Sequence, residues 1–309
     1  MQQPYFDAKT LLRVKDLPLV IKTLAQGFLL GLHASQQRGV GIEFSQFRAY
    51  EPGDELSKID WKLFARSDKY FVREAERESD VNVWLVIDCS ESMLQQSIAG
   101  HSQPKASNIG RWNKLQYARY LAATIAYLAQ RQGDAVGLLA LSSKHQQQIT
   151  ALPGERHWQK LLLALTQLQA SGTFPDTKSI LQQLNSVRKN GLVVVISDFH
   201  QSNDELLTLT SKLSNRHTDV VAFHLDSHDE IHFPYQGMVN FQDLETGEQL
   251  NVSGKQVRSS YLENKQRVIE QLKARLSVQN VQYFNANIDQ ALDQMLVDFL
   301  HTRTRGSRK

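Results

Sequence analysis

The sequence contains a single cysteine, Cys89, among its 309 residues. One thiol cannot form a disulfide within the chain, and this composition is typical of proteins from a reducing compartment. A catalytic thiol is one interpretation of Cys89, but a lone cysteine beside a predicted loop is better explained as a small side chain that packs there. We therefore expect no disulfide within this chain.

Long apolar runs are also missing. No segment has the roughly eighteen consecutive apolar residues that a membrane-spanning helix needs, and the N-terminal residues lack the basic region and apolar core of a signal peptide. The net charge is only +3, which by itself does not indicate a surface for nucleic acid or membranes. We therefore expect a cytoplasmic protein with no inserted segment, although a partner could bring it to a membrane.

The chain divides into three parts by composition. Residues 1–80 begin with a helical pattern and continue with charged, aromatic and turn-rich sequence. Residues 81–300 alternate apolar strand-like runs with amphipathic helical patterns, and residues 301–309 form a basic tail. This alternation predicts an α/β domain in which a mostly parallel, doubly wound sheet has helices on both faces.

Apolar periodicity places the predicted elements of the α/β domain. Strands are expected at 81–87, 135–141, 147–152, 192–196, 219–224 and 281–284. Helices are expected at 115–129, 158–169, 178–187, 205–215, 256–276 and 289–300. Two segments interrupt the alternation: residues 94–112 are predicted to be a polar loop, and residues 238–252 a β-hairpin.

The most informative motif, Asp88-x-Ser90-x-Ser92, follows the first predicted strand. Ligands of open α/β sheets bind beyond the carboxyl ends of the strands, which is where these side chains would lie. A carboxylate and two hydroxyls are hard oxygen donors of the type that Mg²⁺ prefers. The alternative is a helix N-cap network, in which the same side chains bond free backbone N–H groups. The motif alone favours neither interpretation.

The motif resembles the metal-ion-dependent adhesion site of von Willebrand factor A domains. This resemblance implies that two further loops contribute to the site: one provides the hydroxyl of Thr173, and the other the carboxylate of Asp198. Five oxygen-bearing side chains would leave room on Mg²⁺, Mn²⁺ or Ca²⁺ for water and for an acidic side chain of a partner. The predicted metal ligands are Asp88, Ser90, Ser92, Thr173 and Asp198.

Two other patterns are weaker. His224, His228 and His232 are spaced by four residues, but they flank a strand end and a loop, where this spacing is expected to give no common face for zinc. Asp88 has the position of the phosphoryl-accepting aspartate of phosphatases, but Ser90 replaces the second carboxylate that those enzymes usually carry. No glycine-rich phosphate loop or Ser-His-Asp arrangement is evident. We therefore predict no catalytic residues.

The residues around this motif resemble the hallmark of the domain-of-unknown-function fifty-eight family. The matching segments lie at 39–44, 47–54, 58–66, 72–74, 88–93, 196–198 and 243–247. Members of that family join such an N-terminal segment to a von Willebrand A-like domain. Within this segment, Asp60, Trp61 and Arg66 are expected to be structural, because a tryptophan is costly to expose. The polar residues 94–112 depart from the family pattern.

The resemblance implies a bacterial cytosolic adaptor that works with a MoxR-type AAA+ ATPase in the assembly or activation of protein complexes. Its Mg²⁺ would capture an acidic residue of the ATPase or of a client protein. A metal-dependent hydrolase is the alternative, but no His or Glu is tied by a motif to the same loops. A nucleic-acid binder has less support, because aromatic stacking motifs are missing.

Overall fold

The computed structural model describes residues 48–49, 70–72, 82–97, 112–184, 191–201 and 203–290, and a few positions between 292 and 299. The predicted N-terminal segment, including Asp60, Trp61 and Arg66, lies outside these residues apart from β1 (Arg48–Ala49) and β2 (Phe71–Val72), which pair antiparallel. Most of the polar loop predicted at 94–112 and the basic tail also lie outside the described residues.

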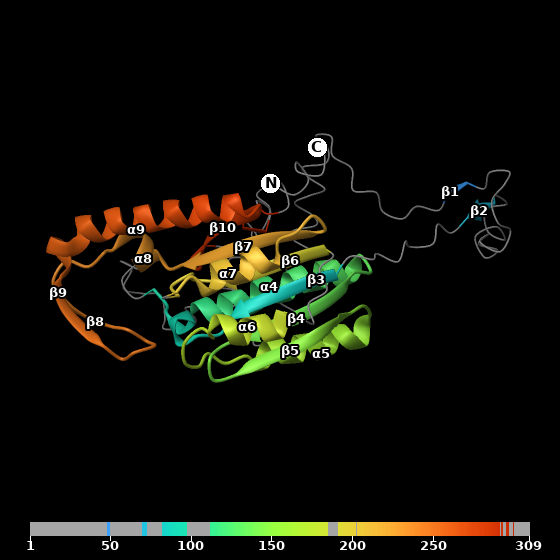
Figure 1. Ribbon diagram of the computed structural model, residues 1–309, viewed down its shortest axis with the longest axis horizontal. Coiled ribbons are helices and arrows are strands. Elements are labelled where there is room, and N and C mark those ends of the chain that lie inside the picture. Colours follow the sequence, from blue (N-terminus) through green and yellow to red (C-terminus); the bar gives the residue numbers. More distant parts are fainter. Residues whose placement is uncertain are drawn as a thin grey trace, which may run out of the picture.

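A six-stranded sheet forms the centre of the α/β domain (Figure 1). Its strands are β3 (Asn82–Asp88), β4 (Ala135–Leu141), β5 (Gln146–Leu152), β6 (Gly191–Ser197), β7 (Thr218–Asp226) and β10 (Val281–Asn287). The order is β10-β7-β6-β3-β4-β5, and of these six strands only β5 runs antiparallel to its neighbour. Counted along the chain this order is 3-2-1-4-5-6, that of doubly wound sheets. The predicted α/β architecture with a doubly wound, mostly parallel sheet is confirmed.

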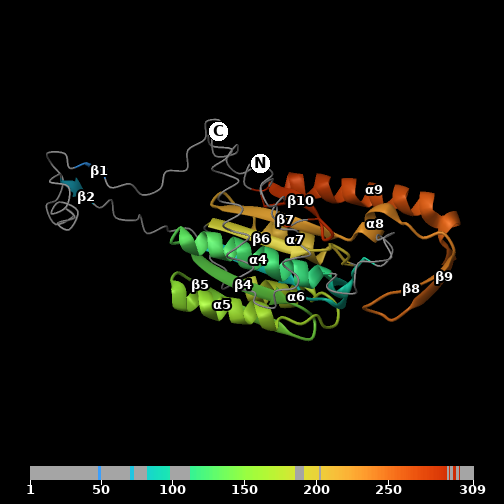
Figure 2. The same ribbon diagram turned by 180° about the vertical axis from the view of Figure 1, so that it is seen from behind.

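Helices cover both faces of the sheet (Figures 1 and 2). They include α4 (Lys114–Arg131), α5 (Glu155–Gln167), α6 (Thr177–Leu184) and α7 (Glu205–Leu213). Val83, Leu85 and Ile87 of β3 belong to the core beneath α4 and α5. Trp84 and Val86 belong to the core beneath α6 and α7, because alternate residues of a strand point to opposite faces. Burial on both faces explains the continuous apolar run of β3.

Helix α4 has a well-defined start. The Asn113 side chain accepts a hydrogen bond from the Gln116 backbone N–H (2.7 Å), and the Gln116 side chain accepts one from the Asn113 N–H (3.1 Å). This capping box satisfies backbone donors that a helix start otherwise leaves free. It makes Lys114 the first helical residue, and the Lys114 side chain is completely buried.

The pairing of β3 with β4 matches a large residue with a small one. Trp84 lies directly opposite Gly137 in the parallel register, and Trp84 is fully buried. A Cβ atom added at Gly137 would lie 2.8 Å from the Trp84 ring, closer than packed carbon atoms approach. The indole therefore requires a glycine at this position of β4.

A separate two-stranded ribbon follows β7 in the chain. Strands β8 (Met238–Gln242) and β9 (Gln249–Ser253) form the hairpin expected from the sequence, and they pair with each other rather than with the six-stranded sheet. Ring contacts of Phe241, near the turn end of β8, with Phe233 and Tyr235 hold this hairpin, at centroid distances of 5.7 and 5.2 Å. The hairpin is thus anchored through Phe241, and within the described strands it does not pair with the main sheet.

Two further helices flank the hairpin. Helix α8 (His228–His232) is not among the predicted elements, although Ser227 opens it with a capping box. Helix α9 (Gly254–Val278) is the longest described helix, yet only Gly254 and Leu276 are buried in it. Its polar composition matches its exposure. Among the described helices, none combines the length and the apolar character needed to cross a membrane.

Candidate functional site

The candidate site lies where β3 and β6 end side by side. The two strands are parallel neighbours, but the chain continues from β3 to β4 on one side and from β6 to β7 on the other. Such a divergence is the topological switch point at which doubly wound sheets bind ligands. Asp88 is the last residue of β3, and Asp198 directly follows β6. The structure therefore brings these two predicted ligands to the same edge of the sheet.

The Asp88 carboxylate is buried, and the hydrogen bonds that it receives from described residues come from neutral groups. Its Oδ1 accepts from the Ser90 N–H (2.9 Å) and the Ser90 hydroxyl (2.7 Å). Its Oδ2 accepts from the Ser197 hydroxyl (2.6 Å) and from Gln201 Nε2 (2.8 Å). The Ser90 and Ser92 hydroxyl oxygens are 2.9 Å apart, so the three members of the motif form one connected cluster.

The N-cap alternative is not what this loop adopts. Ser90 does precede a short 3₁₀ helix, Glu91–Leu94, but its side chain makes no capping hydrogen bond to that helix. The Ser90 hydroxyl contacts Asp88 and Ser92 instead. Both hydroxyl oxygens of the motif therefore face the carboxylate cluster rather than the helix start.

Burial and the nearby charge of Asp198 raise the pKa of Asp88 to about 7, although hydrogen bonds from Ser197 and Ser90 act in the opposite direction. A buried carboxylate is normally compensated by a paired positive charge. Among the described residues, no Lys, Arg or His side chain is bonded to Asp88. A bound cation would supply that charge, so the donor set of one carboxylate and two hydroxyls fits a hard cation such as Mg²⁺.

Asp198 differs from Asp88 because the chain provides its positive partner. Lys114 Nζ lies 3.0 Å from Asp198 Oδ2 and 2.8 Å from Glu230 Oε1, and His200 Nδ1 lies 3.3 Å from Asp198 Oδ2. Although burial favours the neutral amine, the charges of Asp198 and Glu230 raise the pKa of Lys114. Burial would also favour neutral Asp198, but Lys114 and His200 hold the pKa of Asp198 well below its usual range. The expected ligand Asp198 is thus already engaged in a buried ion pair.

Thr173 lies in a loop that contacts the motif through its backbone. The N–H of Ser171 donates to the Cys89 carbonyl (2.9 Å), and the N–H of Glu91 donates to the Gly172 carbonyl (2.7 Å). Thr173 itself is exposed, and its N–H bonds the Ser143 hydroxyl (3.0 Å). Within the described loops, no hydrogen bond joins the Thr173 hydroxyl to Asp88, Ser90 or Ser92. The structure places this loop as predicted, without placing the hydroxyl on the cluster.

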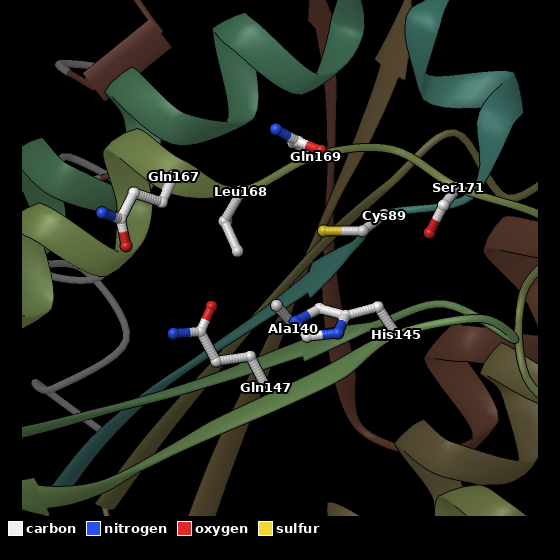
Figure 3. A pocket seen from close by; sticks show the side chains of 8 residues that line it. All are labelled: Cys89, Ala140, His145, Gln147, Gln167, Leu168, Gln169 and Ser171. Atoms are coloured by element: carbon white, nitrogen blue, oxygen red, sulfur yellow. The ribbon is translucent and has the colours of Figure 1, made fainter.

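A pocket of about 310 Å³ lies beside the first loop and is lined by Cys89, His145, Leu168 and Ser171, among others (Figure 3). Its lining contains no carboxylate, lysine or arginine. Burial, and then the charge of Asp88, raises the pKa of Cys89 to about 12. A thiol with this pKa stays protonated at neutral pH and is a poor nucleophile. Cys89 is therefore a packing residue of the core that also lines the pocket, rather than a nucleophile.

The histidine pattern is arranged differently from the prediction. His228 and His232 do share a face, with ring centroids 4.3 Å apart, because residues 228–232 form helix α8 rather than a loop. His224 is separate: it lies in β7, and its Nδ1 is 2.7 Å from the Tyr283 hydroxyl. The expectation that His228 and His232 share no common face was wrong. Even so, no three His, Cys, Asp or Glu side chains of the described part of the chain form a metal-binding group.

Sequence reasoning missed Lys114, Glu230 and His200. Each lies outside the motif loops or carries no motif of its own, and Lys114 is 84 residues before Asp198. One signal was available for Glu230, since Ser227 and Glu230 have the spacing of a capping box. The Glu230 side chain accepts hydrogen bonds from the Ser227 N–H and hydroxyl through Oε2 while Oε1 meets Lys114.

Known proteins resemble this chain at the level of sequence. The uncharacterized protein Rv1480 of Mycobacterium tuberculosis (strain H37Rv) is 28% identical over 244 residues, which cover 78% of this chain and 73% of that protein. The uncharacterized protein YeaD of Bacillus subtilis (strain 168) is 22% identical over 182 residues, covering 58% of this chain and 40% of YeaD.

Solved structures with a similar arrangement are more distant. The conserved hypothetical protein BatB of Bacteroides thetaiotaomicron is 13% identical, with a TM-score of 0.39, and the match covers 72% of this chain and 99% of BatB. The SpRpn10 VWA domain is 14% identical, with a TM-score of 0.37, and the match covers 70% and 93% of the two chains. TM-scores this low carry no argument about function.

A family model, described as "Protein of unknown function DUF58", aligns with residues 46–271. The matched range includes Asp88, Ser90, Ser92, Asp198 and the β8–β9 hairpin. Because this range covers most of the chain, the chain belongs to the DUF58 family of proteins of unknown function.

Proposed function

We propose that this chain is a non-catalytic adaptor that binds an acidic residue of a partner protein through a divalent cation. The observation that carries this proposal is the environment of Asp88. Its buried carboxylate lies at the switch point of the sheet, beside the Ser90 and Ser92 hydroxyls, and its hydrogen-bond donors are all neutral. A protein–metal–carboxylate link would complete the charge balance at this position.

In the proposed site, Asp88, Ser90 and Ser92 hold the cation. Asp198 contributes negative charge to the same edge of the sheet, but it shares that charge with Lys114. Thr173 remains a candidate ligand, because its loop is bonded to the loop that carries Ser90. When bound, Mg²⁺ would supply a positive charge with open coordination positions, which suits a carboxylate ligand. The protein provides the oxygen donors and a buried, prearranged carboxylate.

The proposed partner is a MoxR-type AAA+ ATPase or a client protein that presents an acidic side chain. This part of the proposal rests on the family resemblance of segments 39–66 and 88–93. The proposed place of action is the cytoplasm, as expected for a chain with one buried, unpaired cysteine. Assembly or activation of protein complexes would be the shared task.

Calorimetric titration with Mg²⁺ tests the cation site directly. We expect binding to the wild-type chain and loss of binding in Asp88→Asn, which keeps the shape of the side chain and removes its charge. Asp226→Asn is the matched control, because Asp226 is also a buried carboxylate at the end of a parallel strand but is bonded to Lys265. Equal Mg²⁺ affinities for the wild type and Asp88→Asn would contradict the proposed site.

Co-purification tests the adaptor role. The tagged wild-type chain should retain an acidic-surface partner, such as the ATPase, in Mg²⁺ and release it in a chelator. Asp88→Asn should fail to retain it under both conditions, while Asp226→Asn should behave as the wild type. Retention that is unaffected by the chelator and by Asp88→Asn would leave no role for the cation in partner binding.

A metal-dependent hydrolase is the second candidate, and one observation favours it. The His200 ring is about half exposed and lies 3.3 Å from Asp198, so an imidazole stands near the proposed cation. In that reaction His200 would accept a proton from the attacking water. Turnover of phosphoester substrates with Mg²⁺ or Mn²⁺, lost in both His200→Gln and Asp88→Asn, would support an enzyme. No such turnover is expected from the adaptor.

A further inference from the structure

Glu245 sits at the tip of the β8–β9 hairpin, in a tightly bonded turn. The Asp243 carboxylate accepts hydrogen bonds from the N–H groups of Glu245 (2.8 Å) and Thr246 (2.9 Å). The Gly247 N–H donates to the Asp243 carbonyl (2.9 Å), and Gly247 has a φ of 76°, which glycine adopts without strain. This turn fixes the direction in which Glu245 leaves the hairpin.

Glu245 is the only residue of turn 243–248 that is partly buried, and the other five are exposed. Its neighbours include Ser90, Ser92 and Asp198 of the candidate site. Burial and the charge of Asp198 raise the pKa of Glu245, and hydrogen bonding with the side chains of Ser92 and Ser90 lowers it. The hairpin tip therefore reaches the two hydroxyls that the proposed cation site uses.

This placement of Glu245 is electrostatically unfavourable unless a bound cation links its carboxylate to the site. It brings a third carboxylate to a site that already contains Asp88 and Asp198, where like charges repel. Glu245 is linked to the Ser90 and Ser92 hydroxyls, whereas no three carboxylates of the described residues form a metal-binding group by themselves. A carboxylate beside the hydroxyls is what the proposed function expects of a docked partner.

We propose that Glu245 is an internal ligand of the site, which occupies the position of the partner's acidic side chain until the partner displaces the hairpin. This inference rests on the proposed function for the identity of the competing ligand. It commits the partner to presenting a glutamate or aspartate on a projecting loop, because the chain's own occupant is a glutamate on a tight turn.

The hairpin is built so that its tip can leave the site. Strands β8 and β9 bond only to each other, and two-stranded ribbons are marginally stable alone. Its outer positions Met238 and Leu250 are 75% and 63% exposed, so little apolar surface holds the ribbon down. Displacement would break the tip contact and the ring contacts of Phe241, which lies two residues before Asp243 of the turn.

Hydrogen exchange of the β8–β9 amides in the full chain tests this inference. Glu245→Gln removes the charge of the tip, and Glu248→Gln removes an equal charge from the same turn where the side chain is exposed. Saturating Mg²⁺ is present in all samples. We expect the hairpin amides of Glu245→Gln to exchange about tenfold faster than those of the wild type, because a hydrogen-bonded charged contact is lost, and those of Glu248→Gln to match the wild type.

Chelation separates the inference from the proposed function. If a cation joins Glu245 to the site, a chelator should speed exchange in the wild type and have no further effect on Glu245→Gln, since both changes break one contact. Equal exchange in Glu245→Gln and Glu248→Gln would overturn the internal ligand, whatever Mg²⁺ does. Faster exchange in Glu245→Gln alone, with no Mg²⁺ binding by calorimetry, would retain the internal ligand and overturn the cation.

Discussion

Two buried carboxylates end parallel strands of the same sheet, and their surroundings differ in one respect. Asp226 at the end of β7 is bonded to Lys265 Nζ at 2.6 Å and to Asn285 at 2.7 Å. Although burial acts in the opposite direction, its charged partners lower the pKa of Asp226. Asp88 at the end of β3 is equally buried, its donors within the described part of the chain are neutral, and its pKa is raised to about 7. Lys265 neutralises the charge of Asp226. No described side chain neutralises Asp88, and a bound cation would do so.

Asp198 follows β6, which lies between β3 and β7 in the sheet. It resembles Asp226 because it also has a lysine partner. Its ammonium partner, Lys114, comes from the first turn of α4 and is also bonded to Glu230. Two of three strand ends therefore carry a built-in positive charge. The exception is the end that also carries two hydroxyls, which is why we assign the cation to Asp88.

The largest expected effect comes from removing a built-in charge. Lys114→Met would leave Asp198 and Glu230 buried without a positive partner, and breaking a buried ion pair in this way costs about 3–5 kcal/mol. Urea unfolding should show this loss in the free energy of unfolding. The control is Lys144→Met: its ammonium is exposed and pairs with Glu91 at 3.4 Å, so the loss should be about 0.5 kcal/mol or less. Equal losses would mean that Lys114 contributes no more than a surface charge.

The β7 end should also respond to pH through His224. Burial lowers the pKa of His224 to about 4. Between pH 6.5 and about 4 the unfolded chain binds a proton that the folded chain does not, so the free energy of unfolding falls as the pH falls through this window. The loss should be on the order of 3 kcal/mol. His224→Gln should lack this component when both proteins are unfolded in urea at pH 7 and pH 4. Parallel pH profiles of the two proteins would rule it out.

Neutralising the two carboxylates should change stability in opposite directions. In a chelator at pH 8, Asp88→Asn removes an uncompensated buried charge and should raise the free energy of unfolding by about 1 kcal/mol. Asp226→Asn strands Lys265 and should lower it by about 2 kcal/mol. Thermal and urea unfolding measure both. Destabilisation of similar size in both variants would break the comparison between the strand ends.

The smallest effect is expected at Cys89, beside the unbalanced end. Cys89→Ala should lower the free energy of unfolding by about 1 kcal/mol, because a small buried side chain is shortened, and it should leave Mg²⁺ binding intact. The native thiol should react with a thiol reagent far more slowly than the urea-unfolded chain, since burial raises the pKa of Cys89 to about 12. Fast labelling of the folded protein would require a more accessible thiol.

The strands and the hairpin could be predicted because they depend on patterns in the local sequence. The apolar run before Asp88 predicts a buried strand, and the rule that ligands bind at strand ends then predicts the positions of Asp88 and Ser90. The position of Asp198 was implied by the resemblance to von Willebrand A domains. Strand boundaries differ from the predictions by one or two residues in most cases, as at β3, predicted at 81–87 and observed at 82–88, whereas β4 is predicted and observed at 135–141. The hairpin followed from its turn-rich sequence in the same way.

The parts that escaped prediction depend on contacts between distant segments. Nothing in the sequence around Lys114 distinguishes a buried ammonium from the exposed first residue of an amphipathic helix. Its role appears only in the fold, where the Lys114 side chain meets Asp198 after β6 and Glu230 of α8. Glu245 lies in the family segment 243–247, but the sequence of a turn does not indicate which side chains its tip contacts. Helix α8 is too short for apolar periodicity to mark it, so its histidines were interpreted as loop residues.

The close approach of the Trp84 ring to Gly137 restricts the register in which β3 pairs with β4. A slip of β3 by two residues along β4 would set the indole against Ala135 or Leu139, whose side chains occupy the volume that the ring needs. Only the observed alignment accommodates the ring. One aromatic side chain and one missing methyl group thus determine how far β3 extends, and with it the depth at which its terminal aspartate is presented.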